Sequence, residues 1–250
     1  MRWDADRYDS RHGFVSGYGA DLVEWLNPQP GETVIDLGCG TGDLAEVIHQ
    51  RGASVWGLDA SAEMIAAARS KYPHLRFEVG RAESFRTNGL VDAIFSNATL
   101  HWVTDAAAAV ASMYAALRPG GRLVVELGGK GNVAAIATAL QQALRAGGHD
   151  AQASRQFWYY PSLGAYATLL EGQGFRVVRA AHFDRPTPLD GPEGLHNWIA
   201  MFGGNWLEGL DAPTRIAVTD EAVALARPHL CADGTWKADY VRLRIEARRS

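Results

Sequence analysis

The sequence has few cysteines, no long basic run and no long apolar run. Each of these absences argues against a class of protein or a kind of site. Its 250 residues include only two cysteines. These residues, Cys39 and Cys231, lie far apart in the chain, so neither a disulfide framework nor a cysteine metal cluster is indicated. We therefore expect no metal cofactor, and a reducing compartment such as the cytoplasm fits this cysteine usage.

Long apolar segments are also missing. Because no run of roughly 18 apolar residues occurs, no membrane-spanning helix is expected, and residues 1–6 lack the apolar core of a secretory signal. The net charge is −4, from 24 basic and 28 acidic residues, so a nucleic-acid partner is disfavoured. These absences predict a cytoplasmic protein that binds neither nucleic acid nor membrane.

The chain does have enough apolar residues for a sizeable core. Hydrophobic residues make up 47% of it and charged residues 21%, which is typical of a globular protein. Strand-like and helix-like segments alternate in the first half, and this pattern predicts a parallel sheet covered on both faces. We expect strands at residues 33–37, 54–58, 75–79, 91–96, 122–127, 175–183 and 240–247, and helices at 21–26, 42–50, 61–71, 104–117, 132–146 and 162–171.

The most informative stretch is residues 34–42, Val-Ile-Asp-Leu-Gly-Cys-Gly-Thr-Gly. An apolar strand carrying Asp36 leads into a glycine-rich turn and then a helix. Glycines suit a turn with unusual backbone angles and close approach of a ligand. The spacing is G-x-G-x-G rather than the G-x-G-x-x-G of a Rossmann nucleotide loop. The carboxylates of Asp36 and Asp43 would repel a pyrophosphate, so the loop favours a cationic ligand.

A second acid strengthens this interpretation. Residues 54–59 read as the next strand and end at Asp59, from which a carboxylate can accept two hydrogen bonds from a ribose diol. The loop, Asp36 and Asp59 together resemble the first motifs of the class I S-adenosylmethionine (SAM)-dependent methyltransferases. SAM carries an ammonium and a sulfonium and no phosphate. The alternative is an ordinary strand–turn–helix with helix-capping acids.

This resemblance implies a fold. It is an α/β, Rossmann-like, seven-stranded, mostly parallel sheet with helices on both faces, and its last strand is antiparallel between strands five and six. The family core has only a short turn before that strand, whereas this chain has about 55 residues with helical pattern at 194–210 and 213–226, which we interpret as a lid on the substrate side. We expect one domain, 1–250, with a SAM-binding half at 1–128, a substrate-side half at 129–183, the helical lid at 184–239 and the final strand at 240–250.

The resemblance also implies cofactor contacts. Asp36 would lie near the methionine ammonium of SAM and Asp59 would hold the ribose hydroxyls. Residues 3–8, Trp-Asp-Ala-Asp-Arg-Tyr, and 12–15, His-Gly-Phe-Val, resemble the trans-aconitate methyltransferase-like subgroup, in which the N-terminal segment folds across the SAM pocket. Tyr8 and Phe14 are the candidates for that cover, and packing on the sheet is the alternative. The other expected contacts are Gly38, Cys39, Gly40 and Asn97 at the amino-acid moiety, Ala60 and Met64 beside the adenine, and Arg81, Ala82 and Glu83 near the adenine amino group.

The acceptor side is less defined. Residues 96–102, Ser-Asn-Ala-Thr-Leu-His-Trp, also resemble the trans-aconitate methyltransferase-like subgroup. His101 is a candidate general base because its unperturbed pKa lies near neutrality; orienting the substrate or packing against SAM are the alternatives. Trp102 is a candidate wall of the site. Trp198 and Phe202, four apart in the expected lid, are candidate substrate contacts, although such a stripe equally suits a core.

The sequence therefore predicts a SAM-dependent methyltransferase that moves a methyl group to an O, N or C nucleophile of a small-molecule acceptor by in-line displacement, with S-adenosylhomocysteine as product. Alignment and exclusion of water would be its main contribution. A carboxylate acceptor would need no base, whereas a hydroxyl or carbon acceptor would. The alternatives are a SAM-fold binding protein without methyl transfer and, against the glycine spacing, an NAD-dependent oxidoreductase. Monomer and homodimer are both open.

Overall fold

The computed structural model describes residues 19 and 21–250. Tyr8 and Phe14, the predicted cofactor cover, lie outside the described residues. The chain divides into two compact units. The first, which we call the sheet unit, contains the described residues up to Gly129 together with Trp158–His182 and Leu243–Ser250, and the second, the helical unit, contains Lys130–Phe157 and Phe183–Arg242.

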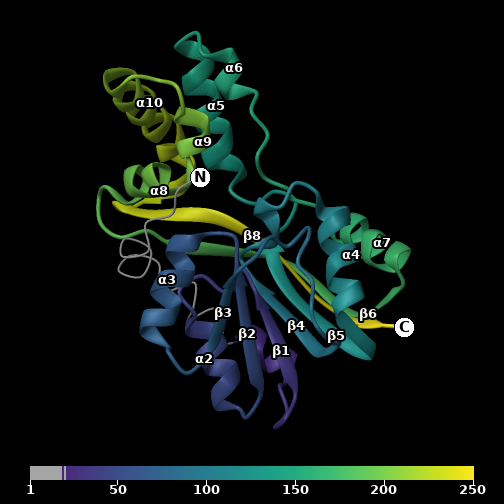
Figure 1. Ribbon diagram of the computed structural model, residues 1–250. Coiled ribbons are helices and arrows are strands. Elements are labelled where there is room, and N and C mark those ends of the chain that lie inside the picture. Colours follow the sequence, from purple (N-terminus) through teal and green to yellow (C-terminus); the bar gives the residue numbers. More distant parts are fainter. Residues whose placement is uncertain (1–18, 20) are drawn as a thin grey trace. The chain divides into compact units, whose positions relative to one another are not determined.

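A mostly parallel sheet is the framework of the fold (Figure 1). Its strands are β1 (Thr33–Leu37), β2 (Ser54–Asp59), β3 (Arg76–Val79), β4 (Val91–Asn97), β5 (Leu117–Gly128), β6 (Phe175–Pro188), β7 (Cys231–Ala232) and β8 (Thr235–Arg249). They lie in the order β3-β2-β1-β4-β5-β8-β6, and β7 pairs with β8 outside that order. The antiparallel last strand between the fifth and sixth is therefore confirmed, and the two-residue β7 is an addition.

The strand order reverses at β1. That strand pairs in parallel with β2 on one side and with β4 on the other. The chain builds β2 and β3 outward in one direction, then returns to β1 and builds β4 and β5 in the other. The connections that follow β1 and β4 therefore diverge at the carboxyl ends of these two strands, which is where open α/β sheets bind ligands.

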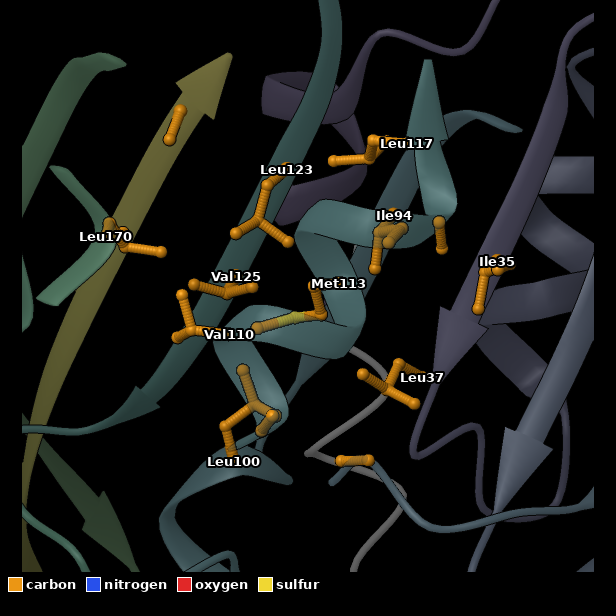
Figure 2. Packing of buried hydrophobic residues seen from close by; sticks show 14 of the residues in the cluster. Ile35, Leu37, Ile94, Leu100, Val110, Met113, Leu117, Leu123, Val125 and Leu170 are labelled. Atoms are coloured by element: carbon orange, nitrogen blue, oxygen red, sulfur yellow. The ribbon is translucent and has the colours of Figure 1, made fainter. Parts of the chain in front are cut away.

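Helices cover the sheet on both faces, as predicted. Ile35 and Leu37 of β1 belong to one buried cluster with Val110 and Met113 (Figure 2), whereas Val34 belongs to a second cluster. Successive strand residues point to opposite faces, so a wholly apolar strand needs a cover on each. In the sheet unit the covering helices are residues 21–26, α2 (Asp43–Gln50), α3 (Ala62–Lys71), α4 (Ala106–Ala116) and α7 (Leu163–Gln173).

Local signals set several helix starts. Ser61 caps α3, its hydroxyl accepting a hydrogen bond from Met64 N at 3.2 Å, as the sequence predicts. Asp105 caps α4 in the same way through Ala108 N, at 3.0 Å. Strands β6 and β8 are longer than predicted, because they pair with each other and pairing between distant segments leaves no signal in the local pattern.

The helical unit contains α5 (Ala134–Ala146), α6 (Asp150–Ala153), α8 (Gly194–Phe202), α9 (Gly204–Leu207) and α10 (Ala212–Leu230). Residues 184–239 thus hold helices α8 to α10, with the first predicted helix divided at Gly203. Trp198 of α8 is buried, and its indole N–H donates to the Tyr240 hydroxyl at 2.7 Å. Its burial suits a core role within this unit. The lid role of the segment, and substrate contact by Trp198 and Phe202, stay predictions.

Candidate active site

A cavity of about 230 Å³ lies at the carboxyl ends of β1, β2 and β4. It therefore occupies the point of strand-order reversal. Most of the predicted cofactor contacts line it. The lining residues are Leu37, Gly38, Gly40, Asp59, Ala60, Met64, Gly80, Arg81, Ala82, Glu83, Asn97, Ala98, Thr99, Trp102 and Val103.

The glycine loop has the conformation that its composition predicts. Gly38 has φ of 78°, and a Cβ added there would lie 2.1 Å from the Thr99 hydroxyl oxygen. The N–H groups of Gly38 and Cys39 donate to the Leu58 carbonyl at 2.6 and 3.0 Å, which ties the loop to β2. Burial raises the pKa of the Cys39 thiol well above its usual value. Cys39 therefore contributes backbone and packing rather than a reactive thiolate.

Asp36 is a buried carboxylate without full hydrogen bonding. Its side chain is enclosed at the end of β1, and its Oδ2 has no hydrogen-bond partner. Burial, reinforced by the charge of nearby Asp59, raises the pKa of Asp36 to about 7. An unsatisfied buried carboxylate is costly, and a cation beside it removes much of that cost. The site therefore fits a ligand with an ammonium group.

Asp59 has a different environment. Its Oδ2 accepts the Gly40 N–H at 3.0 Å and its Oδ1 accepts the Ser61 N–H at 2.8 Å. Burial raises the pKa of Asp59, and these backbone hydrogen bonds oppose the rise. Each carboxylate oxygen has two acceptor positions, so Asp59 can bind hydroxyl donors from the cavity while it holds the loop. A ribose diol fits this arrangement.

The structure corrects one part of the charge argument. The carboxylate of Asp43, at the start of α2, binds the Lys71 ammonium at 2.5 Å and accepts the Tyr72 hydroxyl at 2.7 Å. Its charge is therefore offset locally. Asp59 lines the cavity, whereas Asp36 is buried at the end of β1 and is not among the lining residues. These two carboxylates, rather than Asp43, disfavour a pyrophosphate there.

Part of the cavity lining is apolar. Met64 and Ala82 are buried there, next to Ala60. Arg81 is exposed and forms an ion pair with Glu83 at 2.7 Å. This pair offsets the Arg81 charge, and contact of Ala60, Met64, Arg81, Ala82 and Glu83 with an adenine stays a prediction.

The turn after β4 is joined to the glycine loop. The Ser96 hydroxyl donates to the Leu37 carbonyl at 2.7 Å, and the Thr99 hydroxyl lies 3.2 Å from the Gly38 carbonyl. Ala98 between them has a positive φ of 53°. The sequence prediction assigned no role to Thr99, although its position inside the Ser96–Trp102 run was a usable signal.

His101 lies behind the cavity lining. It belongs to the short 3₁₀ helix η1 (Leu100–Trp102) and is 6% exposed. Its Nδ1 accepts a hydrogen bond from the Gly128 N–H at 3.2 Å. Its ring lies 5.6 Å from that of Trp102 and 5.8 Å from that of Tyr160, between centroids. Trp102 lines the cavity, and its contact with a substrate stays a prediction.

The described residues contain neither a candidate metal site nor a membrane-spanning helix. No group of three or more His, Cys, Asp or Glu side chains there could hold a metal ion, and the expectation of no metal cofactor stays a prediction. No helix in the part of the chain that the structure describes is both long and apolar enough to cross a membrane.

The chain is similar to known methyltransferases. Residues 35–125 match the methyltransferase domain family. A trans-aconitate 2-methyltransferase of Deinococcus radiodurans is 35% identical over 207 residues, covering 79% of each chain. Another, of Methylobacterium nodulans, is 29% identical over 259 residues, 99% of this chain and 98% of that one. A SAM-dependent methyltransferase structure from Mesorhizobium loti shares the fold, with a TM-score of 0.57, 21% identity, and coverage of 92% and 96%.

The relatives show the family and its cofactor. Contact of Asp36 with the ammonium and of Asp59 with the ribose stays a prediction. SAM, when bound, supplies a methyl group on a sulfonium that leaves as a neutral thioether. The chain belongs to the class I SAM-dependent methyltransferases, in the group that includes the trans-aconitate 2-methyltransferases.

Proposed function

We propose that this methyltransferase acts on a small organic acid and methylates a carboxylate oxygen. The observation that carries the proposal is the hydrogen bond from the Gly128 N–H to His101 Nδ1. Because this nitrogen is the acceptor, the neutral imidazole has its proton on Nε2. A second proton, on Nδ1, would place the Nδ1–H donor opposite the Gly128 N–H donor. His101 is therefore poorly arranged to serve as a general base.

A carboxylate acceptor needs no base, because it is already ionised near neutral pH. Its oxygen lone pair attacks the methyl carbon while the carbon–sulfur bond breaks, and no proton has to leave. The names of two relatives support the same chemistry, since trans-aconitate is a carboxylic acid. Hydroxyl and carbon acceptors, in contrast, would require a base.

The residues around the cavity would align the reaction. Asp36 would hold the ammonium and Asp59 the ribose hydroxyls, while Thr99 keeps the glycine loop against the turn after β4. His101 would act as a positioning residue that holds the carboxyl end of β5 through Gly128. Alignment and exclusion of water are the main sources of acceleration for such a displacement.

Product analysis tests the proposal. The purified protein is incubated with SAM and trans-aconitate, cinnamate, octanoate, a phenol and a primary amine, and methylated products are identified by mass spectrometry. We expect methyl esters of at least one acid. Methylation of only the phenol or the amine would overturn the proposal.

A matched pair of His101 variants separates positioning from base catalysis. In His101→Asn the side-chain amide oxygen can replace Nδ1 as acceptor for Gly128, whereas His101→Leu cannot. We expect His101→Asn to keep kcat within about threefold of the parent. General-base catalysis typically contributes 10²- to 10⁴-fold, so a loss of about a hundredfold in both variants would restore the base role.

A further inference from the structure

Four rings form a closed cluster beside the cavity. We call His101, Trp102, Trp158 and Tyr160 the aromatic quartet. Besides the two His101 contacts, the rings of Trp102 and Trp158 lie 5.5 Å apart and those of Trp158 and Tyr160 5.4 Å apart, between centroids. Trp102, Trp158 and Tyr160 are only half-buried. Large aromatic side chains that are grouped together and partly open to solvent offer an apolar surface for a ligand.

The quartet joins two segments that are distant in sequence. Trp102 belongs to η1, whereas Trp158 and Tyr160 follow α6. The Tyr159 N–H donates to the His101 carbonyl at 2.9 Å, which fixes one segment on the other. The ring of Tyr159 packs on the buried core, near Tyr166. The rings of its neighbours Trp158 and Tyr160 contact residues of η1 instead.

The quartet begins where the cavity ends, because Trp102 belongs to both. Its rings offer broad apolar faces and, with His101 neutral, no formal charge. In the described cavity lining the one cationic side chain, Arg81, is paired with Glu83. Such a wall suits a flat, apolar skeleton more than a second or third carboxylate.

We propose that the aromatic quartet is the wall of the acceptor subsite, and that Trp158 and Tyr160 determine specificity by packing against the planar apolar skeleton of the acid. This inference rests on the proposed function, because it takes the acceptor to be an acid. It goes further by naming the kind of acid: a monocarboxylate with a conjugated or aromatic body binds better than a polycarboxylate of similar length.

Binding to the S-adenosylhomocysteine complex provides a test that does not depend on turnover. Cinnamate and trans-aconitate are titrated calorimetrically into the parent and into Trp158→Ala, Tyr160→Leu and Tyr160→Phe. The control is Tyr114→Leu, an aromatic of α4 in the same unit and outside the quartet. We expect tighter binding of cinnamate than of trans-aconitate. The Kd for cinnamate rises at least fivefold in Trp158→Ala and Tyr160→Leu, and stays within twofold in Tyr160→Phe and in the control.

Affinity for SAM is the accompanying readout. If Trp158 and Tyr160 contact only the acceptor, the Kd for SAM in their variants stays within twofold of the parent. An equal loss of SAM and cinnamate affinity overturns the inference. Unchanged cinnamate binding in both Trp158→Ala and Tyr160→Leu overturns it too. No cinnamate binding by the parent, or tighter binding of trans-aconitate, overturns it as well. The two proposals fail separately. If the protein forms methyl esters and the Trp158 and Tyr160 variants do not change this, only the inference about the wall is rejected. If binding of the acid depends on these two residues but no ester forms, only the proposed acceptor chemistry is rejected.

Discussion

At the scale of single residues, the cofactor site contains an unfavourable arrangement that a ligand relieves. Asp36 is enclosed, its Oδ2 has no hydrogen-bond partner, and Asp59 is close enough to raise its pKa. Functional groups commonly retain such strain in the absence of ligand. If Asp36 pairs with the ammonium of SAM, as we propose, it links the affinity for SAM to pH.

We predict that the affinity for SAM falls about five- to tenfold between pH 7.5 and pH 6, because the pKa of Asp36 is raised to about 7 and only its ionised form pairs with the ammonium. Calorimetric titration in buffers of different ionisation enthalpy measures both affinity and proton release. 5′-Methylthioadenosine, which lacks the amino-acid moiety, is the matched ligand and should release no proton. The same pH profile in Asp36→Asn would show that another group is responsible.

The same residue affects stability. The folded-state pKa lies above the reference value of 3.8, so the folded protein binds more protons, and stability is lost as pH rises from about 4 to about 7. Asp36→Asn removes this titration. We predict that it raises the free energy of unfolding at pH 8 by up to about 4 kcal/mol and changes it little at pH 4. Urea denaturation at the two pH values is the measurement, and a variant destabilised at pH 8 would refute the assignment.

At the scale of elements, the glycine loop is held by groups from β2 and from the turn after β4. Leu58 of β2 accepts two of its N–H groups, Asp59 accepts a third, and Thr99 after β4 contacts Gly38. The loop presents backbone to the cavity because its side chains are absent or buried. A small change in loop volume should therefore affect both cofactor binding and stability.

We predict that Gly38→Ala is the more damaging of two alanine substitutions in this loop. Its Cβ would lie 2.1 Å from Thr99 Oγ1, whereas a Cβ at Gly40 meets nothing within 4 Å, although both residues have positive φ. Gly40→Ala should cost about 1–2 kcal/mol of stability from backbone strain, and Gly38→Ala at least 1 kcal/mol more. Thermal and urea unfolding compare the two. Thr99→Gly should recover part of the Gly38→Ala loss, and no recovery would mean that the contact is not its cause.

At the scale of the whole molecule, the returning strand β8 completes the sheet unit through charge as well as backbone pairing. The Arg244 guanidinium donates to Glu126 Oε2 at 2.6 and 2.9 Å, and both side chains are buried. This pair joins the C-terminal strand to β5, whose carboxyl end carries Gly128 behind the site. Formation of the site therefore depends on residues at the far end of the chain.

We predict that Arg244→Met destabilises the protein by about 3 kcal/mol, because it removes the guanidinium that a buried carboxylate binds. Arg244→Met combined with Glu126→Leu should recover most of that loss, since burial of the carboxylate is the larger cost. Urea denaturation of the single and double variants is the comparison. If the double variant is as unstable as Arg244→Met, the lost stability comes from packing of the Arg244 side chain, for example against the Trp25 ring.

The sequence by itself determined the cofactor half of this protein. The loop glycines, Asp36 and Asp59 lie within one strand–turn–helix–strand stretch, so their backbone requirements and spacing are local and readable. Tertiary structure alone decided three other features. The tautomer of His101 depends on Gly128, 27 residues later. The charge of Asp43 is offset by Lys71, and the quartet brings Trp158 to Trp102 and Tyr160 to His101. These features depend on which distant segments meet, and that is set by packing of the whole chain, which no local pattern records.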